Sequence, residues 1–194
     1  MIVTVNTALF YECLSRYLSW FKNTTPEYAA YINSTINAGS LIFTESLDIA
    51  TRMSLFSGYL INDTLYLLCK TPTQPKNQQF LIHHLFTLAL TISPYPQMYP
   101  DITTKLLVVE RTIPIANAIW FLKYYNPKPG KNVQKFMNIL KAIFFVAFTY
   151  YRVIHLSLMS YDCYKNSLPI QAQLGVYTIW AVNMGWYRKL LKMI

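Results

Sequence analysis

Charged residues are scarce in this chain. They make up 13% of its 194 residues, about half the share found in an ordinary soluble domain, whereas 54% of the residues are hydrophobic. Aromatic residues contribute 16%, with 16 tyrosines and 4 tryptophans, and these two types anchor helix ends at lipid headgroups. The composition therefore favours a membrane protein, with a soluble helical protein of unusually apolar core as the alternative.

The chain also lacks the motifs of metal and nucleotide chemistry. It has 3 histidines, too few for the HxxH and HxxHH clusters of di-iron membrane desaturases and hydroxylases, and no HExxH, GxSxG or P-loop pattern occurs. The cysteines, Cys13, Cys69 and Cys163, have no metal-ligand spacing and are expected to pack as apolar residues. No resident metal or cofactor is expected. Acid–base or nucleophilic use of imidazole remains, or no chemistry at all.

Basic residues are missing from residues 1–10. We therefore expect no cleavable signal peptide, and the first apolar segment should remain in the protein. The net charge is +9, but the basic residues stand between apolar segments rather than on one soluble face. We attribute them to membrane topology and expect no nucleic-acid partner.

Seven apolar segments can be marked, most of them near the ~20 residues that a spanning helix needs. They are residues 2–21, 28–46, 53–69, 80–99, 106–122, 136–160 and 168–187. Glu12 and Arg16 interrupt the first segment at a spacing that lets them pair on one helical face. Asn33, Asn37 and Glu45 dilute the second. The expected fold class is all-α, a multi-pass transmembrane helical bundle or barrel of about seven membrane helices, with six spans and one interfacial helix as the alternative.

Lysine and arginine gather in alternate loops, as they do on the cytosolic side of membrane proteins. One side receives Lys22, Lys70, Lys76, Lys123, Lys128, Lys131, Lys135, Arg188, Lys189 and Lys192. The other side receives Arg52, Lys105 and Lys165 alongside Asp48, Asp101 and Asp162. This asymmetry predicts a cytosolic C-terminus and a lumenal or external N-terminus.

Adjacent histidines lie inside the fourth segment, which is otherwise mostly apolar. Ionisable groups within a membrane span tend to face the bundle interior and indicate a functional site. Gln79, His83, Thr87 and Thr91 follow one another four residues apart and form one polar stripe on a helix. We expect this stripe to line an interior cavity, while His84 lies about 100° round, toward a neighbouring helix.

Two further segments carry a carboxylate. Asp63 shares a helical face with Tyr59 and Tyr66, whose hydroxyl groups can donate to it. Arg152, in the sixth segment, is expected to pair with Asp63 or Glu110, because a lone guanidinium is costly in hydrocarbon. Such a pair serves either catalysis or the register of the helices, and both interpretations stay open.

The fifth segment contains a proline one turn after its acid. Glu110, Pro114 and Asn117 share a face, and Pro114 cannot bond the carbonyl of Glu110, so we expect a kink with a free acceptor there. His155, one turn from Arg152, is expected to pack or to form a hydrogen bond rather than to act as a ligand.

The candidate site collects the polar residues of these segments. Catalytic roles are expected, if there are any, for His83, His84, Asp63 and Glu110. Substrate contacts are expected from Tyr59, Thr87, Asn117, Arg152 and Asn183.

Four stretches carry a resemblance to a known family. They are Ser57-Gly58-Tyr59-Leu60-Ile61-Asn62-Asp63, Phe80-Leu81-Ile82-His83-His84, residues 110–120 and residues 182–189. In this order they resemble stretches of the TLC-domain membrane proteins, which include the ceramide synthases and related lipid-handling proteins of the endoplasmic reticulum. The resemblance covers residues 28–194 and leaves 1–27 as an N-terminal membrane segment. It implies a helical membrane barrel with a central cavity.

The family contains a known chemistry and a point of difference. In ceramide synthases the histidine pair belongs to the site that transfers a fatty acyl group from acyl-CoA to a sphingoid amine. Those enzymes carry HD-x-x-D where Glu110-Arg111-Thr112-Ile113-Pro114 stands here. The closer likeness is to the branch associated with membrane lipid composition.

Two functions follow from this resemblance. In the first, the protein is an acyltransferase in which His83 acts as base or transient acyl acceptor beside His84, Asp63 or Glu110 orients an imidazole, and acyl-CoA is the co-substrate. In the second, the same cavity binds membrane lipids without catalysis; a transporter is a distant third. The expected location is the endoplasmic reticulum membrane. Richness in Asn, Ile, Lys and Tyr fits an AT-rich genome, including that of a large virus, in which case the membrane is the host's. The oligomeric state stays open.

Overall fold

The computed structural model describes residues 2–22, 26–43, 46–70 and 75–192, and their regular secondary structure is helical throughout. The elements are α1 (Ile2–Lys22), α2 (Pro26–Phe43), α3 (Ile49–Lys70), α4 (Pro75–Ile92), α5 (Tyr95–Met98), α6 (Pro100–Val108), the 3₁₀ turn η1 (Val109–Thr112), α7 (Ile113–Tyr125), α8 (Lys131–Phe148), the π-helical segment η2 (Thr149–Ile154), α9 (His155–Lys165) and α10 (Ile170–Leu191). The expectation of an all-α chain is confirmed for these residues.

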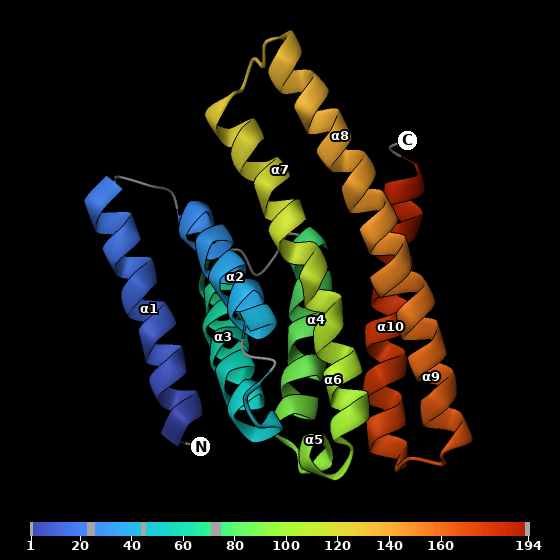
Figure 1. Ribbon diagram of the computed structural model, residues 1–194. Helices are drawn as coiled ribbons and strands as arrows, with labels where there is room; N and C mark the ends of the chain where they lie inside the picture. The colour runs from blue at the N-terminus through green and yellow to red at the C-terminus, as the bar shows by residue number, and fades with distance from the viewer. Residues whose placement is uncertain (1, 23–25, 44–45, 71–74, 193–194) are drawn as a thin grey trace.

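The helices form a closed ring. Helix α3 packs against α4, α4 against α10, α10 against α9 and η2, α8 against α7, α7 against α2, and α2 returns to α3. Helix α1 stands outside the ring, where it packs against α2 and α3 (Figure 1). The N-terminus and α5 lie at one end of the bundle, whereas the C-terminus and the α7–α8 connection lie toward the other (Figure 1).

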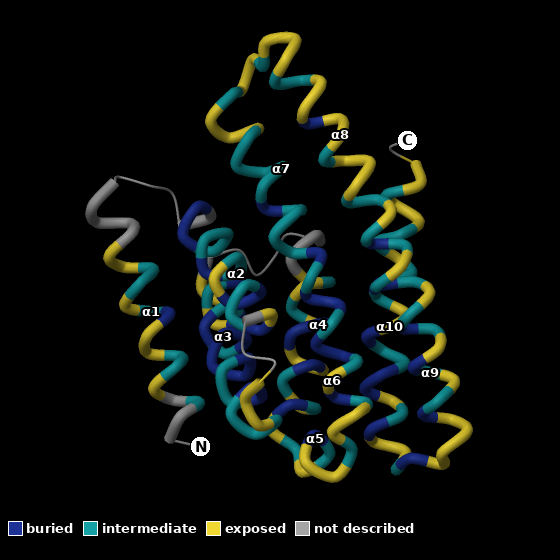
Figure 2. The backbone as a smooth tube through the Cα atoms, in the orientation of Figure 1, coloured by how far each residue is buried: buried dark blue, intermediate teal, exposed yellow. Residues whose placement is uncertain are grey.

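On α4, the histidine and threonine side chains point into the ring and several large apolar side chains point out of it. His83, His84 and Thr87 are buried, whereas Leu85 and Phe86 are exposed. The burial pattern is coloured in Figure 2, where the middle of the bundle is the most buried region and the α7–α8 end is the most exposed. A soluble protein has the reverse pattern, so the arrangement favours lipid around the outside.

Among the described residues, one helical stretch, Lys131–Lys165, is long and apolar enough to cross a membrane. The other long helices carry inward polar residues, such as Asn33 and Asn37 on α2 and the histidines of α4, and these lower their average hydropathy.

Helix α3 begins earlier than the apolar segment 53–69 suggests. Asp48 precedes its first residue, and its carboxylate accepts hydrogen bonds from the backbone nitrogen (3.0 Å) and the hydroxyl group (2.7 Å) of Thr51. This is the geometry of an N-cap, which satisfies an amide that the helix itself leaves without an acceptor. The same bonds hold the pKa of the exposed Asp48 carboxyl below its ordinary value. Arg52 therefore belongs to the first turn of α3 rather than to a loop.

Close packing of α1 on α3 depends on a glycine. A Cβ atom added at Gly58 would lie 2.5 Å from the Cβ of Thr7 and 2.9 Å from the backbone nitrogen of Ala8. Only glycine lets the two helix backbones approach this closely. The Ser57–Asp63 stretch thus holds α1 with Gly58 and reaches the interior with Asp63.

The fifth predicted segment changes helix type near Glu110, where a kink was expected, but the expected free carbonyl of Glu110 is not found. The α6–η1–α7 stretch begins at Pro100, earlier than residue 106, and changes to a 3₁₀ turn at Val109. The carbonyl of Glu110 accepts the backbone N–H of Ile113 instead of staying free. The 3₁₀ turn supplies this bond because it joins residues three apart, so the proline one turn later removes no partner.

The three cysteines, expected to pack as apolar residues, lie in two different environments. Cys163 is buried in the apolar core of α6, α9 and α10, whereas Cys13 and Cys69 are exposed. Cys13 and Cys69 are exposed because they lie on the outer faces of their helices. A small apolar side chain is tolerated on either face of a helix that contacts lipid.

Candidate functional site

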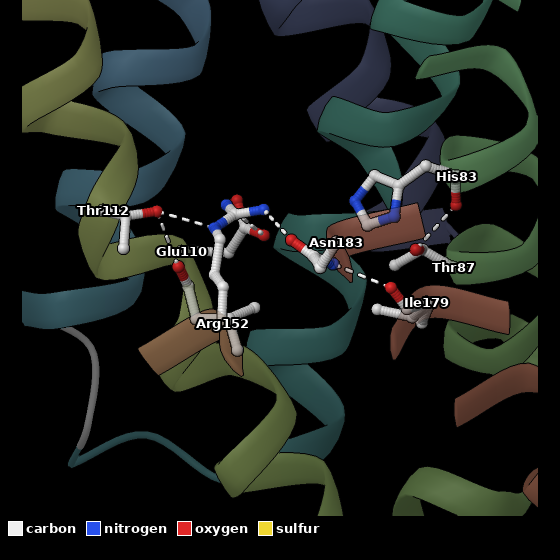
Figure 3. Close-up of polar contacts among 8 residues, drawn as sticks. His83, Thr87, Glu110, Thr112, Arg152, Ile179 and Asn183 are labelled. Carbon is white, nitrogen blue, oxygen red and sulfur yellow. Dashed lines mark hydrogen bonds and ion pairs between the residues drawn. The ribbon is translucent and has the colours of Figure 1, made fainter. Parts of the chain in front are cut away.

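A buried guanidinium lies at the centre of the ring. Arg152 is 3% exposed; its Nε donates to Thr112 Oγ1 at 2.7 Å, and its Nη1 donates to Asn183 Oδ1 at 3.0 Å. Figure 3 shows Arg152 of η2 between Thr112 of η1 and Asn183 of α10. Three elements that are distant in sequence therefore meet at one side chain.

Both partners of Arg152 are themselves held in place. Asn183 is fully buried and donates from Nδ2 to the carbonyl of Ile179 at 2.8 Å, which leaves its oxygen facing Arg152. Thr112 donates to the carbonyl of Val109 at 3.1 Å and so accepts from Arg152. Each of these hydrogen bonds therefore joins one donor to one acceptor, as the burial of polar groups requires.

Glu110 supplies the negative charge of this cluster. Its Oε1 lies 3.8 Å from Nη2 of Arg152, within pairing reach, as expected from sequence, but longer than a hydrogen bond. Glu110 interacts electrostatically with His84 as well as with Arg152. Glu110 therefore pairs with the arginine cluster and also adds negative charge near His84.

The two histidines contact different walls of the interior. His84 Nδ1 lies 3.3 Å from Asp63 Oδ2 on α3, yet the angles do not make a hydrogen bond, so this nitrogen has no hydrogen-bond partner in the described part of the chain. His83 Nδ1 is also buried without a partner there. The ring of His83 packs edge-on against Trp186 of α10 at 5.3 Å between centroids.

The polar stripe of α4 continues below the histidines. Thr87 donates to the carbonyl of His83 at 2.7 Å (Figure 3), and Thr91 accepts from Ser57 of α3 at 2.8 Å. Gln79, at the other end of the stripe, accepts from Lys189 at 2.6 Å. Thr91 also lines a mostly apolar pocket of about 40 Å³ between the end of α4, α5, α6 and the start of α10. The stripe thus runs from a basic end of the ring to an apolar pocket.

Two expected substrate contacts, Asn117 and Tyr59, have different surroundings. Asn117 donates to the Tyr31 carbonyl (3.1 Å), Ser34 Oγ (2.6 Å) and Thr35 Oγ1 (2.8 Å), and so fastens α7 to α2. Tyr59 is buried, with its ring 6.5 Å from that of His84 between centroids. The structure brings Tyr59 to the histidines but does not bring Asn117 to them.

Sequence reasoning missed Thr112 and the burial of Arg52. Thr112 is 1% exposed and Arg52 is 5% exposed. A hydroxyl two residues after Glu110 in an apolar segment was a signal for the first. For the second, the signal was the Asp48-x-x-Thr51 pattern, which predicts a helix start before Arg52.

The arrangement can support proton transfer. Two imidazoles with 5.7 Å between ring centroids face a carboxylate on one side and a guanidinium network on the other. An imidazole with a vacant nitrogen can accept a proton from a bound hydroxyl or amine, while a neighbouring carboxylate stabilises the resulting charge. Among the described residues, no group of three metal-ligating side chains is present.

The family model described as the TLC domain matches residues 3–188. The chain belongs to the TLC-domain family. The match includes α1 as well as the ring, and it places this protein among membrane proteins of lipid metabolism or sensing. No curated protein and no solved structure matches this TLC-domain chain.

Proposed function

We propose that this TLC-domain protein is a multi-pass membrane protein that binds a long-chain lipid inside its helix ring, beside His83 and His84. The observation that carries this proposal is His83 Nδ1, which is buried without a hydrogen-bond partner in the described residues, whereas His84 Nδ1 already faces Asp63 Oδ2 at 3.3 Å. A buried polar nitrogen left unpaired is destabilising. A hydroxyl, amine or amide of a bound lipid supplies the missing partner.

Acyl transfer is the chemistry that this geometry supports best. His83 takes the proton from the hydroxyl or amine of the acceptor lipid while that oxygen or nitrogen bonds to the thioester carbon of acyl-CoA. The carbon–sulfur bond then breaks, and the leaving thiolate takes the proton from His83. Asp63, 3.3 Å from His84, stabilises positive charge on the pair. Acyl-CoA approaches from the basic end of the ring, where lysine and arginine favour its phosphates.

Non-catalytic lipid binding is the second candidate, and one contact favours it. Where ceramide synthases have HD-x-x-D, Glu110 and Thr112 of this chain are engaged with Arg152. In this case the cavity holds an acyl chain or headgroup, and the protein shifts membrane lipid composition by binding alone. This function fits the branch of the family that the sequence resembles most.

The proposed topology has about seven crossings, with the C-terminus in the cytosol. It is supported by the ring with α1 beside it, by opposite ends for the two termini, and by the basic residues of the α7–α8 connection at the C-terminal end (Figure 1). The endoplasmic reticulum is the proposed location, or the corresponding host membrane for a viral source.

The test compares lipid profiles of cells that make equal amounts of wild type, His83→Ala and His83→Asn protein. Under acyl transfer, both variants should abolish the lipid change that the wild type produces, because an amide cannot accept the proton. Under binding alone, His83→Asn should retain most of the change, since it keeps a hydrogen-bonding group in place.

His155→Asn is the matched control, because His155 bonds the carbonyl of Lys105 at 2.9 Å and lies outside the pair. It should leave the lipid profile as in the wild type. Profiles unchanged by both His83 variants would refute a functional role for this residue.

A further inference from the structure

A second buried arginine lies in the first turn of α3. Arg52 is 5% exposed, and its Nε is buried with no hydrogen-bond partner in the part of the chain that the structure describes. No ion pair joins it to a carboxylate among those residues either. A guanidinium has five N–H donors and stays charged at any physiological pH. A buried Nε without an acceptor is unfavourable, and a bound anion would supply that acceptor.

The acids near Arg52 are committed to other partners. Asp48, one turn earlier, uses both carboxylate oxygens on Thr51. Glu110 lies 3.8 Å from Arg152 at the ring centre. The chain thus offers Arg52 no carboxylate of its own in the described residues.

Arg52 lines a pocket that contains a second arginine. Its charged lining residues are Arg52, Arg111 and Glu110, and Glu110 is shared with a third arginine, Arg152. The remaining lining comes from apolar residues of α2 and α6, including Leu41, Ile42 and Leu107. Ile42 is 37% exposed on the outside of the bundle. The pocket therefore combines two arginines with an apolar wall that reaches the outer surface.

We infer that this pocket binds a phosphate group, and that the group belongs to the headgroup of an anionic lipid. Arginine matches phosphate geometry through paired N–H···O bonds. The apolar wall beside it suits the lipid chains, whereas free phosphate would use only the arginines. The inference goes beyond the proposed function, because it assigns a second lipid site whose ligand carries charge and which does not involve the histidine pair. The pocket lies where α2 ends and α3 begins, the end of the ring that the proposed topology places on the lumenal or external side.

The experiment measures thermal unfolding of the purified, delipidated full chain in detergent, with dioleoyl phosphatidic acid, dioleoyl glycerol or inorganic phosphate added. Phosphatidic acid should raise the melting temperature of the wild type, and dioleoyl glycerol, which lacks the phosphate, should not. If inorganic phosphate raises the melting temperature as much as phosphatidic acid does, the bound anion comes from solution. If phosphatidic acid alone raises the melting temperature, the bound anion is a lipid headgroup. No shift with either phosphate probe would overturn the site.

Arg52→Met tests the residue itself. It should weaken binding of phosphatidic acid by at least about tenfold, because a charged hydrogen bond is lost. Without lipid, however, it should melt no lower than the wild type, since it removes a buried charge that has no partner. Arg52→Lys should bind with intermediate affinity. Arg16→Met is the matched control: Arg16 is an exposed arginine paired with Glu12, and its loss should leave binding unchanged.

Two results would refute the inference for Arg52. One is an affinity of Arg52→Met for phosphatidic acid equal to that of the wild type. The other is a lower melting temperature without lipid for Arg52→Met and equally for Glu45→Gln, which would identify a structural ion pair with Glu45, a residue outside the described ones. His83→Ala should keep the response to phosphatidic acid, so failure of this inference and failure of the proposed function are distinguishable.

Discussion

The pairing of Arg152 with Glu110 can be tested by a double-mutant cycle with Arg152→Met and Glu110→Gln. Each substitution keeps the approximate length of the side chain and removes its charge. Either single variant leaves one buried charge without its counter-charge, whereas the double variant leaves none. Both single variants should therefore be destabilised, and the double variant should be less destabilised than the sum of the two.

The distance sets the magnitude. At 3.8 Å between Nη2 and Oε1, two unit charges attract by about 4 kcal/mol for an effective dielectric constant of about 20. Because the pair has no hydrogen bond of its own, we expect a coupling energy of about 2–4 kcal/mol. For a chain of this size that corresponds to roughly 5–15 °C between the observed melting temperature of the double variant and the additive value.

Tryptophan fluorescence during thermal unfolding in detergent measures the cycle, since the chain has 4 tryptophans. The control is the same cycle on Lys105 and Asp162, which lie closer together, at 2.9 Å, but have side chains 45% and 38% exposed at the end of the bundle that the proposed topology places on the lumenal or external side. Exposure screens this pair, so its coupling should be within experimental error despite the shorter distance. Strictly additive losses at Arg152 and Glu110 would show that the two charges do not interact and would refute the reasoning.

Three further predictions concern helix packing, a helix cap and the membrane topology. Gly58→Ala should lower stability by about 1–3 kcal/mol, because its new Cβ meets Thr7, whereas Gly185→Ala, with open space around it, should be neutral or slightly stabilising in the same melting assay. Hydrogen bonds hold the pKa of Asp48 below 3.8, so the stability that Asp48 adds is present at neutral pH and is lost as the pH falls through the depressed pKa. Asp48→Ala should melt lower than the wild type at neutral pH, and Asp48→Asn should keep the cap without this pH dependence. Equal acid sensitivity of Asp48→Asn and the wild type would contradict the assignment. In a cysteine-free background, cysteine placed at Lys128 should react with an impermeant thiol reagent from the cytosolic side, and labelling from the lumenal side would reverse the topology.

The helix positions could be predicted from the sequence because lipid imposes a strong constraint. Each span needs a long apolar face, and each predicted segment overlaps a long helix of the structure, although 28–46 extends past the end of α2 at Phe43 and 80–99 past the end of α4 at Ile92. The inward direction of His83, Thr87 and Thr91 followed from their four-residue spacing, which places them on one face whatever the neighbours are. The meeting of Arg152 with Glu110 followed from the cost of leaving either charge alone.

The rotation and contacts of each helix were less predictable. Asn117 shares a face with Glu110 in an ideal helix, but the 3₁₀ turn at η1 changes the rotation, and Asn117 contacts α2 instead. Thr112 became an acceptor for Arg152 through the same turn. Arg52 was assigned to a loop because average hydropathy sets a span boundary at residue 53, whereas the helix start depends on a single cap, Asp48.

Helices α8 and α9 and the π-helical segment η2 between them form one continuous rod, Lys131–Lys165. The segment η2 sets the rotation of α8 relative to α9 about the axis of this rod. A π turn takes up about one extra residue, and one residue of an α-helix corresponds to roughly 100°. The rod therefore changes phase at η2: α8 presents its packed face to α7, and α9 presents its packed face to α6 and α10. Loss of a single residue within Thr149–Ile154 would restore a regular helix and turn one half of the rod by about 100° relative to the other. Half of its packed residues would then face lipid, so the length of this segment matters as much as its composition.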